Sequence, residues 1–384
     1  MQCLRCGNTE ERYFYKDMKG WYCRKCIMFG RIAVGELPER KPIDRKVIHA
    51  DYQLNYPLTP AQKQCASQIV QYLAHGQDVL VYAACGAGKT ELVMEAIQQS
   101  LRKGYKVGFA ISRRQVVLEI RDRMQTAFSG LKVIAVCEGY TDVTEGDLII
   151  CTMHQLYRYH AAFDLLIMDE VDAFPYRGND VLKHIATHAC IGNRLYLTAT
   201  PDEEMLSEVK KGNLQMVELF QRPHGYPLIV PKVRTALPSM QLLFLIRFLK
   251  EQHKEHAQTL VFVPTIALAE KMSHWLRILF RCTSFTSKTM DKEAVLIKFH
   301  VHHYECLIAT TVLERGITIK GIHVVIYQAD HPVFNEASLI QMIGRVGRNI
   351  EMPTGRGLFL CNEKNQRYRT LYPCATAYEW EALV

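Results

Sequence analysis

The fold is decided by one stretch of sequence, "DVLVYAACGAGKTELVMEAIQQSLRKG" (78–104). Its first six residues form an apolar run that is rich in β-branched and aromatic residues, which predicts a buried strand. From Thr90 onward apolar residues such as Leu92, Ile97 and Leu101 recur at helical spacing, which predicts an amphipathic helix. The stretch therefore predicts a strand, a tight turn and a helix in direct succession.

The turn between this strand and this helix is predicted to bind phosphate. Backbone N–H groups are exposed at the start of a helix, and the helix dipole there favours an anion. Gly86 and Gly88 supply backbone angles that other residues rarely adopt. We expect Lys89 to reach the terminal phosphates of a nucleotide and Thr90 to hold Mg²⁺. The usual motif opens with glycine where this chain has Ala83, a small change, and the strand-to-helix context argues against a turn without function.

A second predicted strand ends in acidic residues, in "LLIMDEVD" (165–172). A carboxylate at such a strand end, here Asp169, can hold Mg²⁺ through water, and its neighbour Glu170 can polarise the attacking water. An isolated acidic pair would more often be a solvated loop. Together with the phosphate-binding turn, the pair predicts a site for nucleotide hydrolysis.

Working outward, further apolar β-rich runs alternate with helical patterns along most of the chain. The predicted strands are 78–83, 107–111, 133–137, 147–152, 165–170, 194–200, 259–264, 282–285, 306–311, 324–327 and 357–361. Strands of this kind, spaced by ten or more residues, are typical of parallel sheets covered on both faces. A stretch with several Pro and Gly residues (221–233) separates two such sets. We expect an α/β chain with a small module at 1–50 and two α/β domains at 51–225 and 226–384.

The N-terminal module contains two closely spaced pairs of cysteines, in the pattern C-x₂-C-x₁₆-C-x₂-C. The four residues are Cys3, Cys6, Cys23 and Cys26. Two thiolate pairs on tight turns fit a closed tetrahedral Zn²⁺ site, so a zinc-ribbon-like module is predicted. Aromatic and basic residues between the pairs either stack on a single nucleic-acid strand or form the small core of the ribbon, and both interpretations stay open.

Composition limits the class of protein further. The chain has 384 residues, a formal net charge of +8 and no apolar run of eighteen residues, and its start does not resemble a signal peptide. We therefore expect a cytosolic protein in which the other nine of the 13 cysteines are core residues rather than disulfide partners. The positive charge favours an anionic partner, with nucleic acid as the first candidate.

The order of motifs resembles that of the superfamily-2 helicases and translocases. Besides the phosphate loop and "DEVD", the matching segments are "LTPAQ" (58–62), "AISRRQVV" (110–117), "CTMHQL" (151–156), "TAT" (198–200), "IATTVLERGITI" (308–319) and "QMIGRVGR" (341–348). The chain departs from the common pattern at Glu314, where Asp is usual, and at Met342, where a basic residue is usual.

The resemblance implies two tandem RecA-like domains that close on ATP and Mg²⁺, and it implies roles for individual residues. For hydrolysis these are Lys89, Glu170, Arg345 and Arg348, and for nucleotide binding Gln62, Gly86, Gly88, Lys89, Thr90, Asp169 and Gln341, with Thr90 and Asp169 as magnesium ligands. For nucleic-acid contact they are Arg113, Arg114, Thr152, His154, Thr310 and Thr311, and for coupling between the sites Thr198 and Thr200.

Taken with the cysteine module, the motifs are most similar to those of the ComFA family of late-competence ATPases. That resemblance implies an ATP-driven translocase of single-stranded DNA, acting at the inner face of the cell membrane in the uptake of transforming DNA. The uptake channel, other late-competence proteins and further copies of the chain are the partners it suggests. The nearest alternative is a strand-separating DNA helicase of the primosomal type in replication restart or repair. An inactive nucleotide-dependent scaffold and a zinc-dependent regulator are more distant alternatives.

Overall fold

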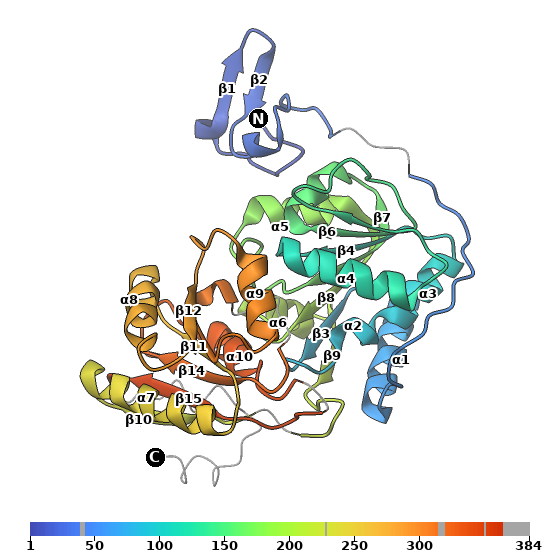
Figure 1. Cartoon of the computed structure of the whole chain (residues 1–384). Helices are drawn as coiled ribbons and strands as arrows, with labels where there is room; N and C mark the ends of the chain where they lie inside the picture. Colours follow the sequence, from blue (N-terminus) through green and yellow to red (C-terminus); the bar gives the residue numbers. More distant parts are fainter. Residues whose placement is uncertain (39–42, 227–228, 314–318, 349–350, 364–384) are drawn as a thin grey trace. The chain divides into compact units, whose positions relative to one another are not determined.

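The computed structural model describes residues 1–38, 43–226, 229–313, 319–348 and 351–363. These residues divide into two compact units, the first ending at Phe220 and the second beginning at Gln221 (Figure 1). Among the described residues, no helix is long and apolar enough to cross a membrane. The domain limits expected at residues 50 and 225 stay a prediction.

The first unit begins with the cysteine module, a two-stranded antiparallel hairpin of β1 (Phe14–Asp17) and β2 (Gly20–Cys23). Its small core consists of Phe14, Ile32 and the four cysteines of the predicted zinc site. Phe29 lies at the edge of this core and also packs on the main domain, where its ring centroid is 5.1 Å from that of Tyr157. The module is therefore in contact with the α/β part of the same unit.

The main part of the first unit is a seven-stranded parallel sheet in the order β5-β6-β4-β7-β8-β3-β9. The strands are β3 (Val79–Ala83), β4 (Val107–Ile111), β5 (Val133–Val136), β6 (Leu148–Thr152), β7 (Phe163–Asp169), β8 (Cys190–Thr198) and β9 (Gln215–Leu219). Six of them match predicted runs, while β9 was not predicted. β9 lies at the sheet edge and has one exposed residue, Glu218, and a half-buried Gln215, so its sequence lacks the continuous apolar pattern of a central strand.

Helices pack on this sheet (Figure 1). They are α1 (Pro60–Ala74), α3 (Met94–Arg102), α4 (Arg114–Ala127) and α5 (Asp180–Ala189). The short helix α2 (Lys89–Leu92) packs on α1 and α3, and α6 (Glu203–Lys210) follows β8. The single helix expected from Thr90 is divided between α2 and α3, with a break at Val93. Its apolar residues nevertheless face the core, because Leu92, Ile97 and Leu101 are buried as predicted.

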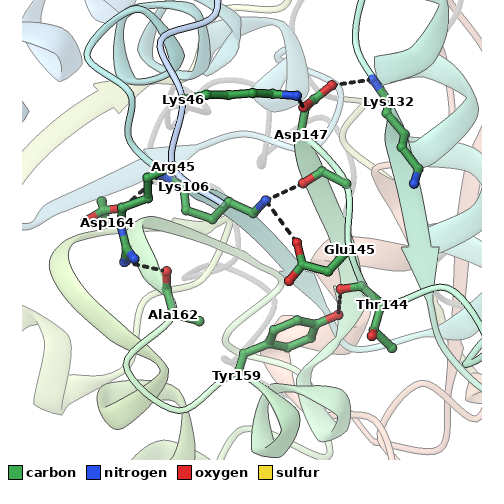
Figure 2. A network of polar contacts seen from close by, with 11 residues as sticks. Arg45, Lys46, Lys106, Lys132, Thr144, Glu145, Asp147, Tyr159, Ala162 and Asp164 are labelled. Atoms are coloured by element: carbon green, nitrogen blue, oxygen red, sulfur yellow. Dashed lines mark hydrogen bonds and ion pairs between the residues drawn. The ribbon is translucent and has the colours of Figure 1, made fainter. Parts of the chain in front are cut away.

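The segment that follows the module is bonded to the amino ends of the strands, as Figure 2 shows. Arg45 Nε donates to Asp164 Oδ2 at 2.8 Å, and Asp164 Oδ2 also accepts the backbone N–H of Lys106. Lys46 Nζ lies 3.0 Å from Asp147 Oδ1. These ion pairs connect the segment to the amino ends of the strands. The predicted site lies at the opposite, carboxyl ends.

The second unit is built on a six-stranded parallel sheet in the order β10-β15-β14-β11-β13-β12. The strands are β10 (Lys232–Thr235), β11 (Thr259–Phe262), β12 (Cys282–Phe285), β13 (Cys306–Ala309), β14 (His323–Tyr327) and β15 (Gly357–Cys361), and the helices are α7 (Pro238–Lys254), α8 (Ile266–Leu276), α9 (Lys292–His300) and α10 (Glu336–Ile343). Alternate residues of β11 enter two different cores, Leu260 and Phe262 on one face and Val261 on the other. Both faces of the sheet are covered, which explains the buried runs of β11, β13, β14 and β15, whereas the edge strand β10 is mostly exposed and was not predicted.

Candidate nucleotide, metal and nucleic-acid sites

The phosphate loop lies between β3 and α2, as predicted. Gly86 and Gly88 have φ angles of +82° and +84°, in the left-handed region that favours glycine. Ala83 is the last residue of β3 and pairs with Leu219 of β9, so this position needs no glycine. Lys89 Nζ donates to the carbonyl oxygen of Ala83 at 3.2 Å, which folds the side chain over the loop.

Gln62, predicted to read the base, is buried at the start of α1 and contacts the same loop. Its Nε2 donates to the carbonyl oxygen of Ala87 at 2.9 Å, and its Oε1 accepts the backbone N–H of Thr59 at 3.0 Å. A Cβ atom at Gly88 would lie 2.6 Å from Gln62 Nε2. Glycine at this position is therefore favoured by the backbone angle, and a Cβ atom there would displace the side-chain amide of Gln62.

The acidic residues Asp169 and Glu170 lie at the carboxyl end of β7, next to β8, which in turn neighbours the phosphate-loop strand. Asp169 Oδ1 accepts the backbone N–H of Glu170 at 2.8 Å, and Glu170 has a φ of +55°. Burial raises the pKa of Asp169 to about 6, while the positive charge of Lys89 opposes this shift and Glu170 adds to it. Burial disfavours the charged form of this carboxylate, and positive charge nearby favours it. Such a carboxylate is suited to bind a cation, which would stabilise the charged form further.

One functional candidate was missed by the sequence analysis: Asp172, the last residue of "DEVD". Its two carboxylate oxygens accept hydrogen bonds from the hydroxyl groups of Thr198 at 2.8 Å and of Thr200 at 2.7 Å. Thr198 Oγ1 also accepts the backbone N–H of Thr200 at 3.0 Å. The predicted coupling segment is thus hydrogen-bonded to the acidic segment. The only signal for this link in the sequence is the position of Asp172 as the third acidic residue of "DEVD".

The residues predicted to contact nucleic acid in the first unit lie in two neighbouring loops. Thr152 ends β6 and pairs with Ile111 at the end of β4, and Arg113 lies two residues after Ile111, at the N-cap of α4. Arg114 Nε donates to the carbonyl oxygen of Glu138 at 2.8 Å. The sheet therefore brings Arg113 and Thr152 to the same edge.

His154, the fourth candidate in these loops, lies beside the cysteine module. Its ring centroid is 6.3 Å from that of Phe29, and burial lowers its pKa. A neutral ring in contact with the module has less opportunity to bind a phosphate than Arg113 in the neighbouring loop.

In the second unit the candidates lie in α10, in the loop that follows α10 and at the end of β13. Gln341 lies in α10, and Arg345 and Arg348 follow it in a tight loop, here named the arginine loop (344–348). Arg345 is buried, and Arg348 Nε donates to the carbonyl oxygen of Gly344 at 3.0 Å. Thr310 and Thr311 follow β13 directly, whereas Glu314 lies outside the described residues.

The four cysteines of the module converge. Their sulfur atoms all lie within 4.8 Å of one another, and all four residues are buried. The Sγ atoms of Cys3 and Cys26 are 3.7 Å apart, as are those of Cys6 and Cys23. A tetrahedral zinc ion with Zn–S bonds of about 2.3 Å requires S–S edges of about 3.8 Å. The thiols therefore fit Zn²⁺, and Arg5 donates from its guanidinium to Cys26 Sγ at 3.1 Å.

Comparisons with known proteins define the class. Residues 55–203 match the family model of the type III restriction enzyme res subunit, and residues 240–350 match that of the helicase conserved C-terminal domain. The fold resembles that of S. cerevisiae Dbp5 bound to RNA and ADP BeF3, with a TM-score of 0.62, 14% identity and coverage of 83% of this chain and 93% of that one. It also resembles RecG bound to a three-way DNA junction, with a TM-score of 0.61, 19% identity and coverage of 86% and 46%. The chain is a superfamily-2 helicase-like ATPase with two RecA-like sheets.

The module identifies the family within this class. Residues 1–37 match the model of the competence protein ComFA N-terminal domain. Competence protein ComFA of Bacillus subtilis (strain 168) is 32% identical over 92% of this chain and 80% of its own length. The ComFA protein of Streptococcus pneumoniae (strain ATCC BAA-255 / R6) is 33% identical over 93% and 85%. The chain belongs to the ComFA family.

A match to the helicase RecG is weaker. The RecG protein of Streptococcus pneumoniae serotype 4 is 24% identical over 79% of this chain, but over only 48% of its own length. The alternative of a strand-separating replication or repair helicase is therefore not favoured.

Proposed function

We propose that the chain is an ATP-driven translocase of single-stranded DNA that draws transforming DNA into the cell during natural competence. The observation that carries this proposal is the combination, in one chain of the ComFA family, of the cysteine module with residues for hydrolysis on both parallel sheets. Uptake requires work against a membrane barrier, and a motor that couples ATP hydrolysis to movement along a strand supplies it.

In the proposed cycle the first unit binds the nucleotide. Lys89 contacts the terminal phosphates, the backbone of Gly86 and Gly88 lines them, and Gln62 recognises the base. Thr90 and Asp169 would hold Mg²⁺, which supplies charge neutralisation on the phosphates when bound. Glu170, one residue beyond Asp169, orients and polarises the attacking water.

The second unit completes the site when the two units close on ATP. Arg345 and Arg348 then approach the γ-phosphate and stabilise the charge of the transition state, and Gln341 contacts the nucleotide. Asp172, bonded to Thr198 and Thr200, is placed to transmit the state of the nucleotide to the neighbouring strand ends. Repeated closing and opening would move the strand contacts of one unit past those of the other.

The proposed strand path follows the loops at the carboxyl ends of β4 and β6 and the segment after β13. Arg113, Arg114, Thr152 and His154 are its candidates in the first unit, and Thr310 and Thr311 in the second. Similar folds have been solved with nucleic acid: Dbp5 with RNA, RecG with a DNA junction and Lhr of Mycobacterium smegmatis with single-stranded DNA. The family supports DNA as the substrate of this chain.

Single-stranded DNA should stimulate ATP hydrolysis well above the basal rate, because a strand that contacts both units favours closure. We expect stimulation of about 10-fold or more with single-stranded DNA, and less with duplex DNA or RNA of equal length. Raising the salt concentration should reduce the apparent DNA affinity steeply, since each phosphate contact releases a counterion. Steady-state phosphate release with the three nucleic acids, from 50 to 300 mM salt, measures this.

Lys89→Ala is the control in this assay, because it reports any contaminating ATPase. Equal rates with and without single-stranded DNA at low salt would overturn the motor proposal and favour a scaffold or regulator. Preferential stimulation by RNA would overturn the choice of substrate.

We further propose that the module holds one Zn²⁺ through Cys3, Cys6, Cys23 and Cys26. Structural zinc contributes directly to the folding of small modules whose own core is slight, and this core has few apolar residues. Cys23→Ser should therefore lose the metal and lower the stability of the module, while ATP binding survives. Elemental analysis and thermal melting of protein purified under reducing conditions measure both effects.

Cys190→Ser is the matched control for this substitution, since Cys190 lies outside the cluster at the start of β8. It should keep about one zinc per chain. Wild-type protein without zinc, or Cys23→Ser protein with a full complement, would refute the assignment.

For the cellular setting, we propose a cytoplasmic protein that works at the inner face of the membrane beside the DNA-uptake channel. Membership of the ComFA family supports this setting. The channel, other late-competence proteins and further copies of the chain are the candidate partners. Fractionation of competent cells with and without the channel protein tests the location.

A further inference from the structure

Arg222 occupies an unusual position just after the end of the first unit. Its side chain is 1% exposed, although it is a charged residue in the segment that connects the two sheets. The guanidinium donates to three backbone carbonyl oxygens: Nη1 to Val346 at 2.8 Å and to Gly347 at 3.1 Å, and Nη2 to Gly344 at 3.1 Å. All three carbonyls belong to the arginine loop, so this buried cation holds the backbone between Arg345 and Arg348.

His224 adds a fourth hydrogen bond to the same loop. Its Nε2 lies 2.9 Å from the carbonyl oxygen of Gly347, and its Nδ1 lies 3.2 Å from the backbone N–H of Tyr226. An acceptor on one side and a donor on the other require the neutral tautomer with the proton on Nε2. Burial lowers the pKa of His224, the hydrogen bond to Gly347 opposes this and the charge of Arg222 adds to it, and the net lowering favours the neutral form.

The arginine loop itself has little freedom in this arrangement. Gly347 has a φ of +66°, and a Cβ atom there would lie 2.2 Å from the carbonyl oxygen of Pro353. Arg348 Nε donates to the carbonyl oxygen of Gly344, which also accepts from Arg222. The backbone that carries Arg345 and Arg348 is thus held on one side by Arg222 and packed closely on another.

Three residues before Arg222 the chain is bonded to the phosphate loop. Leu219 ends β9, pairs with Ala83 of β3 and accepts the backbone N–H of Ala84, the first residue of the loop, at 2.9 Å. Phe220 lies edge-on against the ring of Tyr82, with centroids 4.8 Å apart. The chain is therefore anchored beside the phosphate loop at Leu219 and at the arginine loop at Arg222.

Covalent connectivity alone limits the distance between these two anchors. Three residues of extended chain span at most about 11 Å between Cα atoms, and this limit holds for any placement of the two units. We propose that Arg222 is a positioning residue for ATP hydrolysis, which fixes the backbone of the arginine loop to the short chain leaving the phosphate loop. This inference rests on the proposed role of Arg345 and Arg348 in hydrolysis.

The first test separates positioning from binding by comparing kcat with KM. Arg222→Gln and Arg222→Lys should both lower the kcat of DNA-stimulated ATP hydrolysis about 100-fold, because displacement of a catalytic group by about 1 Å costs that much. The lysine keeps the charge but loses the planar fork that reaches three carbonyls. The KM for ATP should change less than about 3-fold, since the guanidinium of Arg222 is already bonded to backbone carbonyls of the arginine loop. Arg234→Gln, an exposed arginine of β10, is the matched control and should retain the wild-type kcat.

A double-mutant cycle shows whether Arg222 acts through the arginine loop. Arg222→Gln combined with Arg348→Ala should lose less than the product of the two single losses, because only Arg345 is left in the loop to be misplaced once Arg348 is removed. Multiplication of the two single losses would indicate general structural damage and would overturn the proposal. Thermal melting accompanies each variant, and His224→Phe, which removes one hydrogen bond of four, provides a milder test if Arg222→Gln does not fold.

The length of the chain between the anchors is tested by insertion. Two glycines between Phe220 and Gln221 should lower kcat about 10-fold or more while leaving both anchors intact, since short insertions cost little stability. The same insertion between Gly225 and Tyr226 lies beyond Arg222 and disturbs only the N–H that Tyr226 donates to His224, so it should lower kcat much less. Equal effects of the two insertions would overturn the role of the short connection.

Failure of this inference and failure of the proposed function give different results. Wild-type kcat in both Arg222 variants with a large loss in Arg348→Ala overturns the positioning role alone. Wild-type kcat in Arg348→Ala overturns the proposed hydrolytic site, and the positioning role with it.

Discussion

Lys89→Ala is expected to abolish ATP turnover and to weaken nucleotide binding at the same time. Lys89 belongs to the first unit and comes immediately after Gly88. Its ammonium group lies over the phosphate loop, where it donates a hydrogen bond to the carbonyl oxygen of Ala83. We propose that it contacts the phosphates in every nucleotide state, so its loss should affect the ground state and the transition state together. We expect the Kd for ATP to rise about 10-fold or more and single-turnover hydrolysis to fall by at least about 10³-fold.

Lys103→Ala is the matched control, because this exposed lysine follows α3 in the same strand–loop–helix stretch. Its nucleotide affinity and turnover should equal those of the wild type. Fluorescent-nucleotide titration and rapid-quench hydrolysis measure the two quantities. Wild-type affinity and turnover in Lys89→Ala would show that the loop does not bind the hydrolysed nucleotide.

Arg348→Ala should give the opposite pattern, with ATP affinity near that of the wild type and a large loss of turnover. Arg348 belongs to the second unit and is proposed to matter only when the units close. An arginine that neutralises transition-state charge in this way contributes about 10³-fold to the rate, which corresponds to about 4 kcal/mol. The measurement is the same pair of binding and single-turnover assays, and an unchanged rate would contradict the proposed closure.

Two further variants strengthen this comparison. Arg356→Ala removes an exposed arginine of the second unit, paired with Glu255, and should leave the rate unchanged. Glu170→Gln should match Arg348→Ala in rate but retain single-stranded DNA more tightly in the presence of ATP, because the nucleotide still bridges the closed units. Release of DNA at the wild-type rate by Glu170→Gln would show that DNA binding does not depend on whether ATP is hydrolysed, and would contradict this prediction.

Much of the fold could be predicted from the sequence, because it depends on patterns among neighbouring residues. The strands β3, β4, β6 and β7 match continuous apolar runs, which arise where a strand is buried on both faces of a parallel sheet. The glycines of the phosphate loop have the positive φ angles that their positions predicted. The four cysteines converge as their spacing suggested.

Other features could not be predicted, because local patterns do not encode them. β9 is an edge strand with polar residues, and the break at Val93 divides a pattern that reads as one helix. Asp172 was passed over because an acidic residue after a strand is ordinary until Thr198 and Thr200 are found beside it.

The sequence by itself determined the class of the protein, its family and the motifs expected at the strand ends. Each of these is recognised from short motifs whose residues are close together in the chain. Only the tertiary structure decided which distant residues support them. Arg222 lies more than 120 positions from the carbonyls it binds at Val346 and Gly347, in a stretch that reads as a linker with prolines and glycines. A charged side chain has no periodicity that marks it as buried, and its burial is compensated only by the carbonyls that folding brings to it.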